Sequence, residues 1–358
     1  MTEKKRLLSL DILRGITVAG MILVNNSGGK YTFEPLKHAA WNGLTPCDLV
    51  FPFFLFIMGI STFISLNKFN FEASSQVVGK ILKRTLIILL IGWGISWFSQ
   101  ALNGNFFPYD TLRLTGVMPR IALCYGVVSL IALFVNHKHL IKLIVGLLIG
   151  YSAIVLLGNG YANDETNILA IIDRNLIGFS HLYQKTAVDP EGVTSTLAAI
   201  AHTLIGFCCG SLIIRVKDVD QKVLHLFLVG FILMALGWLL SYSMPFNKRI
   251  WSPSFTLMTC GGASSLLAAL MYLIDIKKKE KWSKVFLIFG VNPLFLYVAS
   301  ELLAIALSKF KIKHAIYENI NLIITNPYWA SALYAILFTA LLGVAGYVLY
   351  KKRIYIKI

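Results

Sequence analysis

Long apolar stretches alternate with short polar connections along almost the whole chain. The hydrocarbon core of a bilayer is about 30 Å thick, so a helix that crosses it needs about 20 mostly apolar residues. We therefore predict an all-α, polytopic helical bundle that crosses a membrane about ten times. The predicted spans are residues 7–24, 48–66, 81–102, 113–135, 140–158, 195–214, 222–243, 253–275, 285–307 and 329–350.

The composition agrees with this pattern. Hydrophobic residues make up 57% of the chain and charged residues 14%, whereas a soluble domain has about 25% charged residues. No linker or low-complexity tract divides the sequence, so we expect residues 1–358 to form a single transmembrane domain. No cleavage-site pattern precedes the first span, which we expect to be a retained helix rather than a signal peptide.

The net charge of +16 comes from basic residues clustered between spans, a pattern that argues against nucleic-acid binding. One set of span ends carries 21 of them, at 4–6, 68–84, 138–142, 215–222, 277–284 and 351–357, and the opposite set carries nine. The positive-inside rule then predicts a plasma (inner) membrane protein with both termini in the cytoplasm. The connection 25–47 would face outside, covered by polar loops at 159–194 and 308–328.

The cysteines lie in or beside apolar stretches and show no metal-ligand spacing. Their number is odd, so they give no complete disulfide framework. We expect small core residues and no metal site. The five are Cys47, Cys124, Cys208, Cys209 and Cys260.

Two charged residues, Asp11 and Arg14, lie inside the first predicted span. A lone charge at the bilayer centre costs about 2.5–3.5 kcal/mol on insertion scales. A spacing of three residues places both side chains on one helical face, where they can pair. We expect a structural ion pair, and the alternative is a polar cavity that reaches toward the cytoplasmic side.

The connection 25–47 is unusually polar and gives the strongest indication of a site. It begins with NNSGGKY, whose two glycines let the backbone approach a ligand closely. Asn25 can donate through its side-chain amide, and Lys30 adds a positive charge. A simple turn would explain the glycines, but not why the turn leads directly into KHAAWNGLTPCD.

His38 is the best catalytic candidate because it alone in this connection titrates near neutral pH. Lone histidines are more often structural, but here Trp41 supplies an amphipathic ring and Asn42 opens a turn dipeptide. Thr45-Pro46 predicts a helix start, which places Asp48 in the first turn, where a carboxylate suits the helix dipole. Trp41, Asn42 and Asp48 are candidate substrate-binding residues.

Further polar groups lie within or at the ends of later spans. Arg120 follows Pro119 in TGVMPRIALCY, where the proline predicts a kink. A buried arginine needs an anionic partner, for which Asp48, Glu301 and a ligand phosphate are the candidates.

Two polar segments at the outer ends of spans each allow a structural and a functional interpretation. VDPEGVTSTLAAI places Ser195 at a helix start, either as part of a cap or in an anion site. MPFNKRIWSPSF brings Asn247, Lys248 and Arg249 together before a span, either as an interfacial anchor with Trp251 or as ligand contacts.

The dipeptide Asn292-Pro293 interrupts the predicted span 285–307. Such a break frees backbone carbonyls and is tolerated only where protein or a water-filled cavity satisfies them. Asn292 is therefore the second indication of a cavity and a candidate binding residue.

Seven segments resemble, in the same order, those of the heparan-α-glucosaminide N-acetyltransferase family and its bacterial relatives. The resemblance implies a multi-pass protein that takes acetyl from cytosolic acetyl-CoA and places it on a glucosamine amine across the membrane. It matches His38 to the family's active histidine and Asn25 to a partner asparagine, and it suggests a homodimer. The segments are SLDILRGITVAGMILVN, GGKY, KHAAWNGLTPCDLVFPFFLFIMG, GVMPRIALCY, VDPEGVTSTLAAI, FNKRIWSPSF and GVNPLFLYV.

We therefore expect a lipid-embedded acetyltransferase that uses acetyl-CoA and no metal. His38 would take a proton from the attacking amine while Asn25 stabilises the oxyanion, or His38 would first be acetylated itself. Arg120, Lys248 or Arg249 would hold phosphates or anionic groups of the acceptor. The alternatives are an amino-sugar transporter, which would explain the broken span, and an O-acetyltransferase for a cell-wall glycan.

Overall fold

The computed structural model describes residues 7–356, and within them the chain forms helices and no strand. The prediction of an all-α bundle is confirmed. The basic residues at 4–6 and Lys357, which contributed to the predicted orientation of the termini, lie outside the described residues.

Within residues 7–356, nine helices are long and apolar enough to cross a membrane. They agree with the predicted spans to within a few residues at most ends. They are α1 (Leu8–Asn25), α2 (Pro46–Leu66), α3 (Ser75–Leu102), α4 (Val117–Phe134), α5 (Leu140–Leu157), α7 (Thr196–Arg215), α8 (Val219–Leu240), α9 (Pro253–Leu270) and α13 (Pro327–Lys351).

The tenth predicted span is broken into α10 (Lys284–Val291) and α11 (Pro293–Lys309). The two parts are bent by 73° where Asn292 meets Pro293, as the dipeptide predicted. Single helical turns lie in the connections. These are η1 (Glu34–Leu36), η2 (Asn67–Phe69), η3 (His137–His139), η4 (Phe179–His181), η6 (Lys281–Ser283) and the π-helical turn η5 (Met271–Ile276), which extends α9.

The two long connections 159–194 and 308–328 were predicted as polar loops, and this prediction is wrong in part. Each contains a short helix, α6 (Ile168–Ile177) in the first and α12 (Ile312–Ile323) in the second. Both helices are amphipathic, with apolar residues on one face and polar residues on the other. They are too short to cross a membrane, so a search for apolar spans passes over them.

Close helix pairs form the core of the bundle, and glycine makes the closest approaches possible. A side chain at Gly206 of α7 would run into the carbonyl of Phe56 on α2, and one at Gly59 would run into the carbonyl of Thr203. Lipid tails are as apolar as the helices, so packing of small residues drives such association in membranes. The pairs α1–α10 and α8–α9 meet in the same way.

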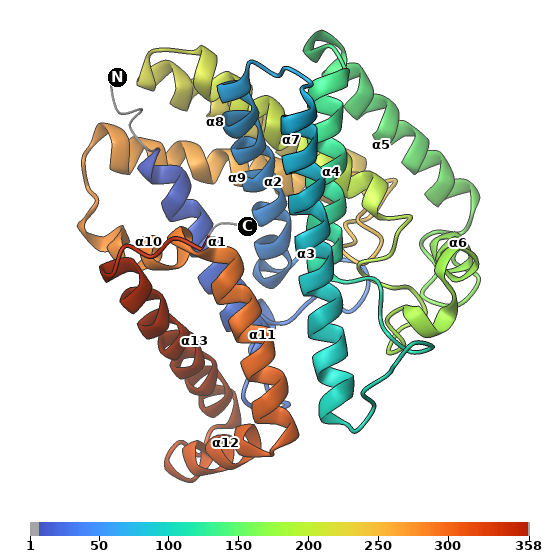
Figure 1. Cartoon of the computed structure of the whole chain (residues 1–358), viewed down its shortest axis with the longest axis vertical. Coiled ribbons are helices and arrows are strands. Elements are labelled where there is room, and N and C mark those ends of the chain that lie inside the picture. The colour runs from blue at the N-terminus through green and yellow to red at the C-terminus, as the bar shows by residue number, and fades with distance from the viewer. Residues whose placement is uncertain (1–6, 357–358) are drawn as a thin grey trace.

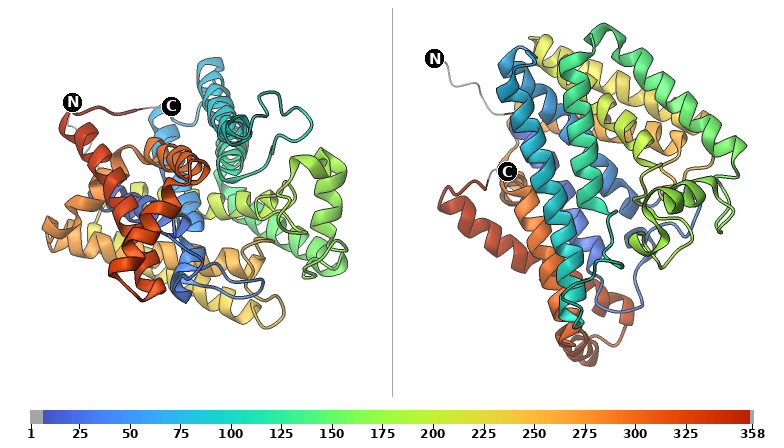
Figure 2. Two further views of the ribbon diagram at one scale, coloured as in Figure 1. Left: turned by 90° about the horizontal axis from the view of Figure 1, so that it is seen from below. Right: turned by 45° about the vertical axis from the view of Figure 1, so that its right-hand side comes forward.

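The helices run between two opposite ends of the molecule. Figure 1 shows the α2–α3 and α4–α5 connections at the top, and the α3–α4 connection and α12 at the bottom. The right-hand view of Figure 2 shows α3 and α4 packed side by side along this direction. The basic clusters at 68–84 and 138–142 therefore lie at one end, away from the segment 25–45.

The close contact between α2 and α7 predicts a matched pair of effects. Gly206→Ala should lower the thermal unfolding midpoint in detergent, because the added Cβ must push the two helices apart, at a cost of about 1–3 kcal/mol. Gly150→Ala on α5 should leave the midpoint unchanged or slightly raised, because no atom lies within 4 Å of its new Cβ. Equal midpoints for the two variants would contradict this packing.

Candidate active site

A cavity of about 270 Å³ opens beside His38. Three segments far apart in the sequence build its walls: the start of α2 with the residues before it, the loop that precedes α7, and the loop that precedes α9. The lining residues are His38, Ala39, Trp41, Asp48, Tyr183, Thr186, Pro190, Glu191, Lys248 and Arg249.

The imidazole of His38 is held by the buried carboxylate of Asp48. His38 Nδ1 lies 2.7 Å from Asp48 Oδ1, and the histidine side chain is 48% exposed while that of the aspartate is 1% exposed. The second oxygen of Asp48 accepts from the backbone N–H groups of Ala39 and Thr45 and from the Thr45 hydroxyl, at 3.0–3.2 Å. With Nδ1–H donated to Asp48, the Nε2 atom carries the lone pair of the ring.

The local sequence explains why Asp48 occupies this place. Helix α2 begins at Pro46 with Thr45 as its N-cap, as predicted, and Asp48 completes a capping box. A carboxylate in the first turn also interacts favourably with the helix dipole. The helix start therefore fixes Asp48, and Asp48 fixes His38.

Lys248 brings a second nitrogen to the same point from the other end of the chain. Its Nζ lies 3.0 Å from Nδ1 and 3.4 Å from Nε2 of His38, and 3.6 Å from Oδ1 of Asp48. Burial lowers the pKa of Lys248, while the charge of Asp48 opposes this change. The Cys47 thiol also contacts the imidazole, with Sγ 3.2 Å from Nδ1.

Other predicted residues shape the walls instead of reaching into the cavity. The Asn247 side chain donates to Asn42 Oδ1 at 3.1 Å and accepts from the Ile250 N–H, which fixes the loop that carries Lys248. Trp41 donates its indole N–H to the carbonyl of Tyr161 at 2.8 Å, so its ring is held in place. The guanidinium carbon of Arg249 lies 6.0 Å from the centre of the Trp41 ring.

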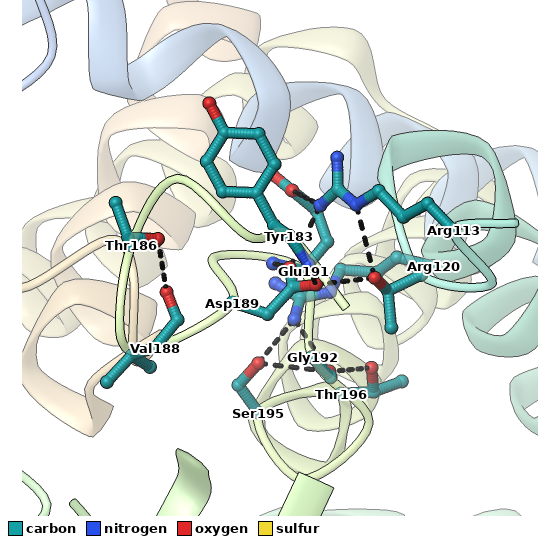
Figure 3. Close-up of polar contacts among 11 residues, drawn as sticks. Arg113, Arg120, Tyr183, Thr186, Val188, Asp189, Glu191, Gly192, Ser195 and Thr196 are labelled. Atoms are coloured by element: carbon teal, nitrogen blue, oxygen red, sulfur yellow. Dashed lines mark hydrogen bonds and ion pairs between the residues drawn. The ribbon is translucent and has the colours of Figure 1, made fainter. Parts of the chain in front are cut away.

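Two acidic residues, Asp189 and Glu191, lie in the segment VDPEGVTSTLAAI, and Glu191 lines the His38 cavity. Arg113 Nη2 lies 2.9 Å from Oδ1 of Asp189 and 2.9 Å from Oε2 of Glu191 (Figure 3). Helix α7 begins only at Thr196, so neither carboxylate caps it. Coulombic attraction to the two carboxylates raises the pKa of Arg113 despite its burial.

Arg120 pairs with neither of the two carboxylates among its predicted partners, and the third candidate, a ligand phosphate, stays a prediction. Within residues 7–356 Arg120 forms no ion pair with Asp48 or Glu301, and its guanidinium instead donates to the Gly192 carbonyl and the Ser195 hydroxyl (Figure 3). Ser195 in turn donates to the same carbonyl and makes no capping bond through its side chain. These oxygens pair only with Nη2 of Arg120, whose buried Nε and Nη1 have no hydrogen-bond partner among the described residues. The guanidinium carbon lies 5.1 Å from the centre of the Trp251 ring. Arg120 and Ser195 brace the turn that leads into α7.

Pro119, where a kink was predicted, lies at the start of a helix instead. Helix α4 begins at Val117, later than the predicted span, so Pro119 lies in its first turn. A proline there removes no intrahelical hydrogen bond, because the first N–H groups of a helix have no partner inside it.

Three candidate residues lie away from the His38 cavity. Asn25 contacts the carboxyl group of Glu301 on α11. Lys30 is exposed and forms no hydrogen bond or ion pair with the described part of the chain. The Asn292 side chain donates to the Ile354 carbonyl and accepts from the Ile356 N–H, both at 2.9 Å, so it anchors the C-terminal segment.

A second cavity, of about 240 Å³, lies between α1, α2, α3, α4 and the start of α11. Arg14 lines it and forms an ion pair with Asp11 at 2.8 Å and a hydrogen bond to Ser61 Oγ at 3.0 Å. Arg84 and Tyr125 line both this cavity and an adjoining cleft of about 500 Å³, which also contains Lys80 and Lys83. The ion pair of Arg14 with Asp11 was predicted, whereas Lys80, Lys83 and Arg84 served in the sequence only as markers of orientation.

Comparisons with known proteins agree with the order of motifs along the chain. A family model described as the catalytic region of heparan-α-glucosaminide N-acetyltransferase matches residues 6–186, which is half of the chain. The chain belongs to this family. The resemblance seen in the sequence is thereby confirmed.

Two family members are similar over the whole chain. Heparan-α-glucosaminide N-acetyltransferase from Homo sapiens is 29% identical over 416 residues, which cover 99% of this chain and 60% of the human protein. The enzyme of that name from Mus musculus is 28% identical over 425 residues, which cover all of this chain and 61% of the mouse protein. The chain thus spans about 60% of the length of these curated relatives.

The acidic wall predicts a difference in stability between two ion pairs. Arg113→Met should lower the free energy of unfolding by about 3 kcal/mol, because it leaves the buried Asp189 carboxylate without a counter-charge. Lys37→Met removes an exposed pair with Glu34 and should leave the free energy of unfolding almost unchanged. Denaturant unfolding in detergent measures both, and equal losses would contradict the structural role of Arg113.

Proposed function

We propose that this chain is a transmembrane N-acetyltransferase that moves acetyl from cytosolic acetyl-CoA to an amino-sugar or glycan acceptor on the extracytoplasmic side. The observation that carries the proposal is the contact of His38 with both Asp48 and Lys248 at an open cavity. Membership of an acetyltransferase family supports the choice of reaction. The whole chain would act as one membrane-embedded domain, with lipid around it and a homodimer as its assembly.

The His38–Asp48 pair suits general base catalysis. Asp48 orients the ring and stabilises the imidazolium that forms, while Nε2 receives a proton from the attacking amine. The nitrogen–carbon bond forms as the carbon–sulfur bond of the thioester breaks. The proton on His38 then passes to the leaving thiolate, so the ring returns to its starting state.

Lys248 is placed to stabilise the negative charge that develops on the thioester oxygen. Its Nζ lies within 3.4 Å of both ring nitrogens of His38, so an oxyanion formed beside Nε2 would lie close to it. We assign the oxyanion role to Lys248 rather than to Asn25, because the Asn25 side chain contacts Glu301 and does not line the His38 cavity.

The second cavity supports a donor route from the opposite end of the bundle. Lys80, Lys83 and Arg84 offer positive charge for the phosphates of acetyl-CoA at the predicted cytoplasmic side. Arg14 marks the inner end of this space on α1. From Arg14 to Asn25 the helix rises about 16 Å, so α1 would run alongside the pantetheine arm. The contact of Asn25 with Glu301 would then lie between the donor cavity and His38.

One observation favours the rival function of an amino-sugar transporter. The 73° bend at Asn292 and the cavity beside Pro293 resemble the broken helices that line transporter sites. A transporter would move the sugar without cleaving a thioester. An O-acetyltransferase would use the same groups on a hydroxyl acceptor.

The proposal predicts that purified protein in liposomes releases free coenzyme A when acetyl-CoA is present on the cytoplasmic face and glucosamine on the other. His38→Ala should lower this rate about 10²- to 10⁴-fold, because no other group in the cavity replaces the base. His314→Ala, at an exposed site on α12, is the matched control and should leave the rate unchanged. Sugar uptake without thioester cleavage, undiminished in His38→Ala, would identify a transporter instead.

The role given to Lys248 predicts a shifted alkaline limb in the pH–rate profile. The protonated amine is the active form, and burial lowers the pKa of Lys248 below its ordinary 10.5. The rate should therefore fall as pH rises through this lowered pKa, and Lys248→Arg should move the fall to higher pH because guanidinium keeps its proton. Lys248→Met should lower kcat about 10²- to 10³-fold. An unchanged kcat and profile in Lys248→Met would exclude this role.

A further inference from the structure

Glu191 presents a carboxylate oxygen to the His38 cavity that no other described residue uses. Its Oε2 accepts from Arg113 at 2.9 Å, whereas Oε1 forms no hydrogen bond within residues 7–356. The side chain is 14% exposed and lines the same cavity as His38 and Lys248. One oxygen of this carboxylate is thus held in place and the other is free to accept from a ligand.

The acidic wall carries one more negative charge than Arg113 can neutralise. Asp189 is fully buried and its oxygens are occupied by Arg113, by the Thr115 hydroxyl at 2.5 Å, and by the N–H groups of Tyr183 and Glu191. The single arginine charge is therefore shared between two carboxylates. The remaining negative charge faces the cavity at Glu191.

The position of Glu191 is fixed by the turn that follows it (Figure 3). Arg120 and Ser195 hold the Gly192 carbonyl, and the Thr194 N–H and hydroxyl donate to Asp173 at 2.8 and 2.6 Å. A side chain at position 192 would collide with the carboxylate of Asp173. The loop therefore packs directly on α6, and Glu191 is held by buried contacts on both sides.

The cavity is consequently bipolar, with Lys248 and Arg249 on one wall and Glu191 on another. Acetyl transfer to an amine is favoured by charges of both signs in the site, because the acceptor arrives as a cation while the thioester oxygen becomes an anion. The fixed ring of Trp41 adds a flat apolar surface of the kind that packs against a sugar face. The volume lies below the roughly 300–1,000 Å³ of sites for drug-sized ligands, which suits a single sugar ring.

We infer that Glu191 is the specificity-determining residue that recognises the ammonium group of the acceptor and so selects amino sugars over neutral sugars. The inference rests on the proposed function for the identity of the acceptor. In the proposed complex Oε1 accepts a charge-assisted hydrogen bond from the ammonium group. That group loses its extra proton to solvent before His38 takes the proton released on attack.

The experiment compares the binding of glucosamine and glucose to the full chain in lipid nanodiscs by titration calorimetry. Wild-type protein should bind glucosamine at least about tenfold more tightly than glucose, the range for a hydrogen bond to a charged group. Glu191→Gln should remove this preference while glucose binding stays the same. Glu165→Gln, on the exposed Glu165 beside Arg174, is the matched control and should keep the preference.

Three outcomes would overturn the inference: wild-type protein that does not prefer glucosamine, a Glu191→Gln variant that keeps the preference, or a variant that loses both sugars equally. The last would mean that Glu191 only supports Arg113. Release of coenzyme A is measured on the same samples. Preferential glucosamine binding that Glu191→Gln abolishes, without coenzyme A release by wild-type protein, would uphold this inference and refute the proposed enzyme.

Discussion

A buried carboxylate costs several kcal/mol unless charges and hydrogen bonds compensate it, and Asp48 is compensated on every side. One oxygen completes the cap of α2 and holds the preceding segment through Ala39 and Thr45. The other meets His38 and lies 3.6 Å from the Lys248 amine. The Asp48 carboxylate therefore fixes the start of α2, the orientation of the imidazole and the position of the loop before α9.

This dependence explains why the site lies at the end of a helix and not in the middle of the bundle. A carboxylate, an imidazole and an amine must be solvated by water or paired with one another. The bilayer interior contains no water, so there such groups can only pair. At the start of α2 the imidazole of His38 is half exposed while the carboxylate of Asp48 is buried. Deeper in the bundle, Asp11 and Arg14 form an ion pair with each other.

The sequence predicted the parts of this structure that local chemistry determines. Spans follow from runs of apolar residues, and the start of α2 followed from Thr45-Pro46, so nine or ten spans and the cap were found. His38 and Asp48 are ten residues apart, and the helix start brings them together. Lys248 was a candidate only because its segment was polar. Lys248 and His38 are 210 residues apart along the chain, so no local pattern could predict that they lie in contact.

The failures have the same cause. Asp48 and Glu301 were candidate partners for Arg120, but its Nη2 donates instead to the carbonyl of Gly192, 72 residues away. The ion pairs of Asp189 and Glu191 were not predicted, because the sequence does not reveal that Arg113 approaches from the end of another span. The predicted role of Asn25 as partner of His38 stays a prediction. In the structure Asn25 contacts Glu301 on α11, whereas His38 contacts Lys248 from the loop before α9.

The separation of the two cavities sets a requirement on the chemistry. The basic cleft with Lys80 and Arg84 lies beside the connection between α2 and α3, whereas His38 lies before the start of α2. The length of α2, 21 residues, therefore separates them, which is about 30 Å. Under the proposed function, a donor bound at the basic cleft must extend along the helices toward His38, and its arm would pass through the second cavity beside Arg14.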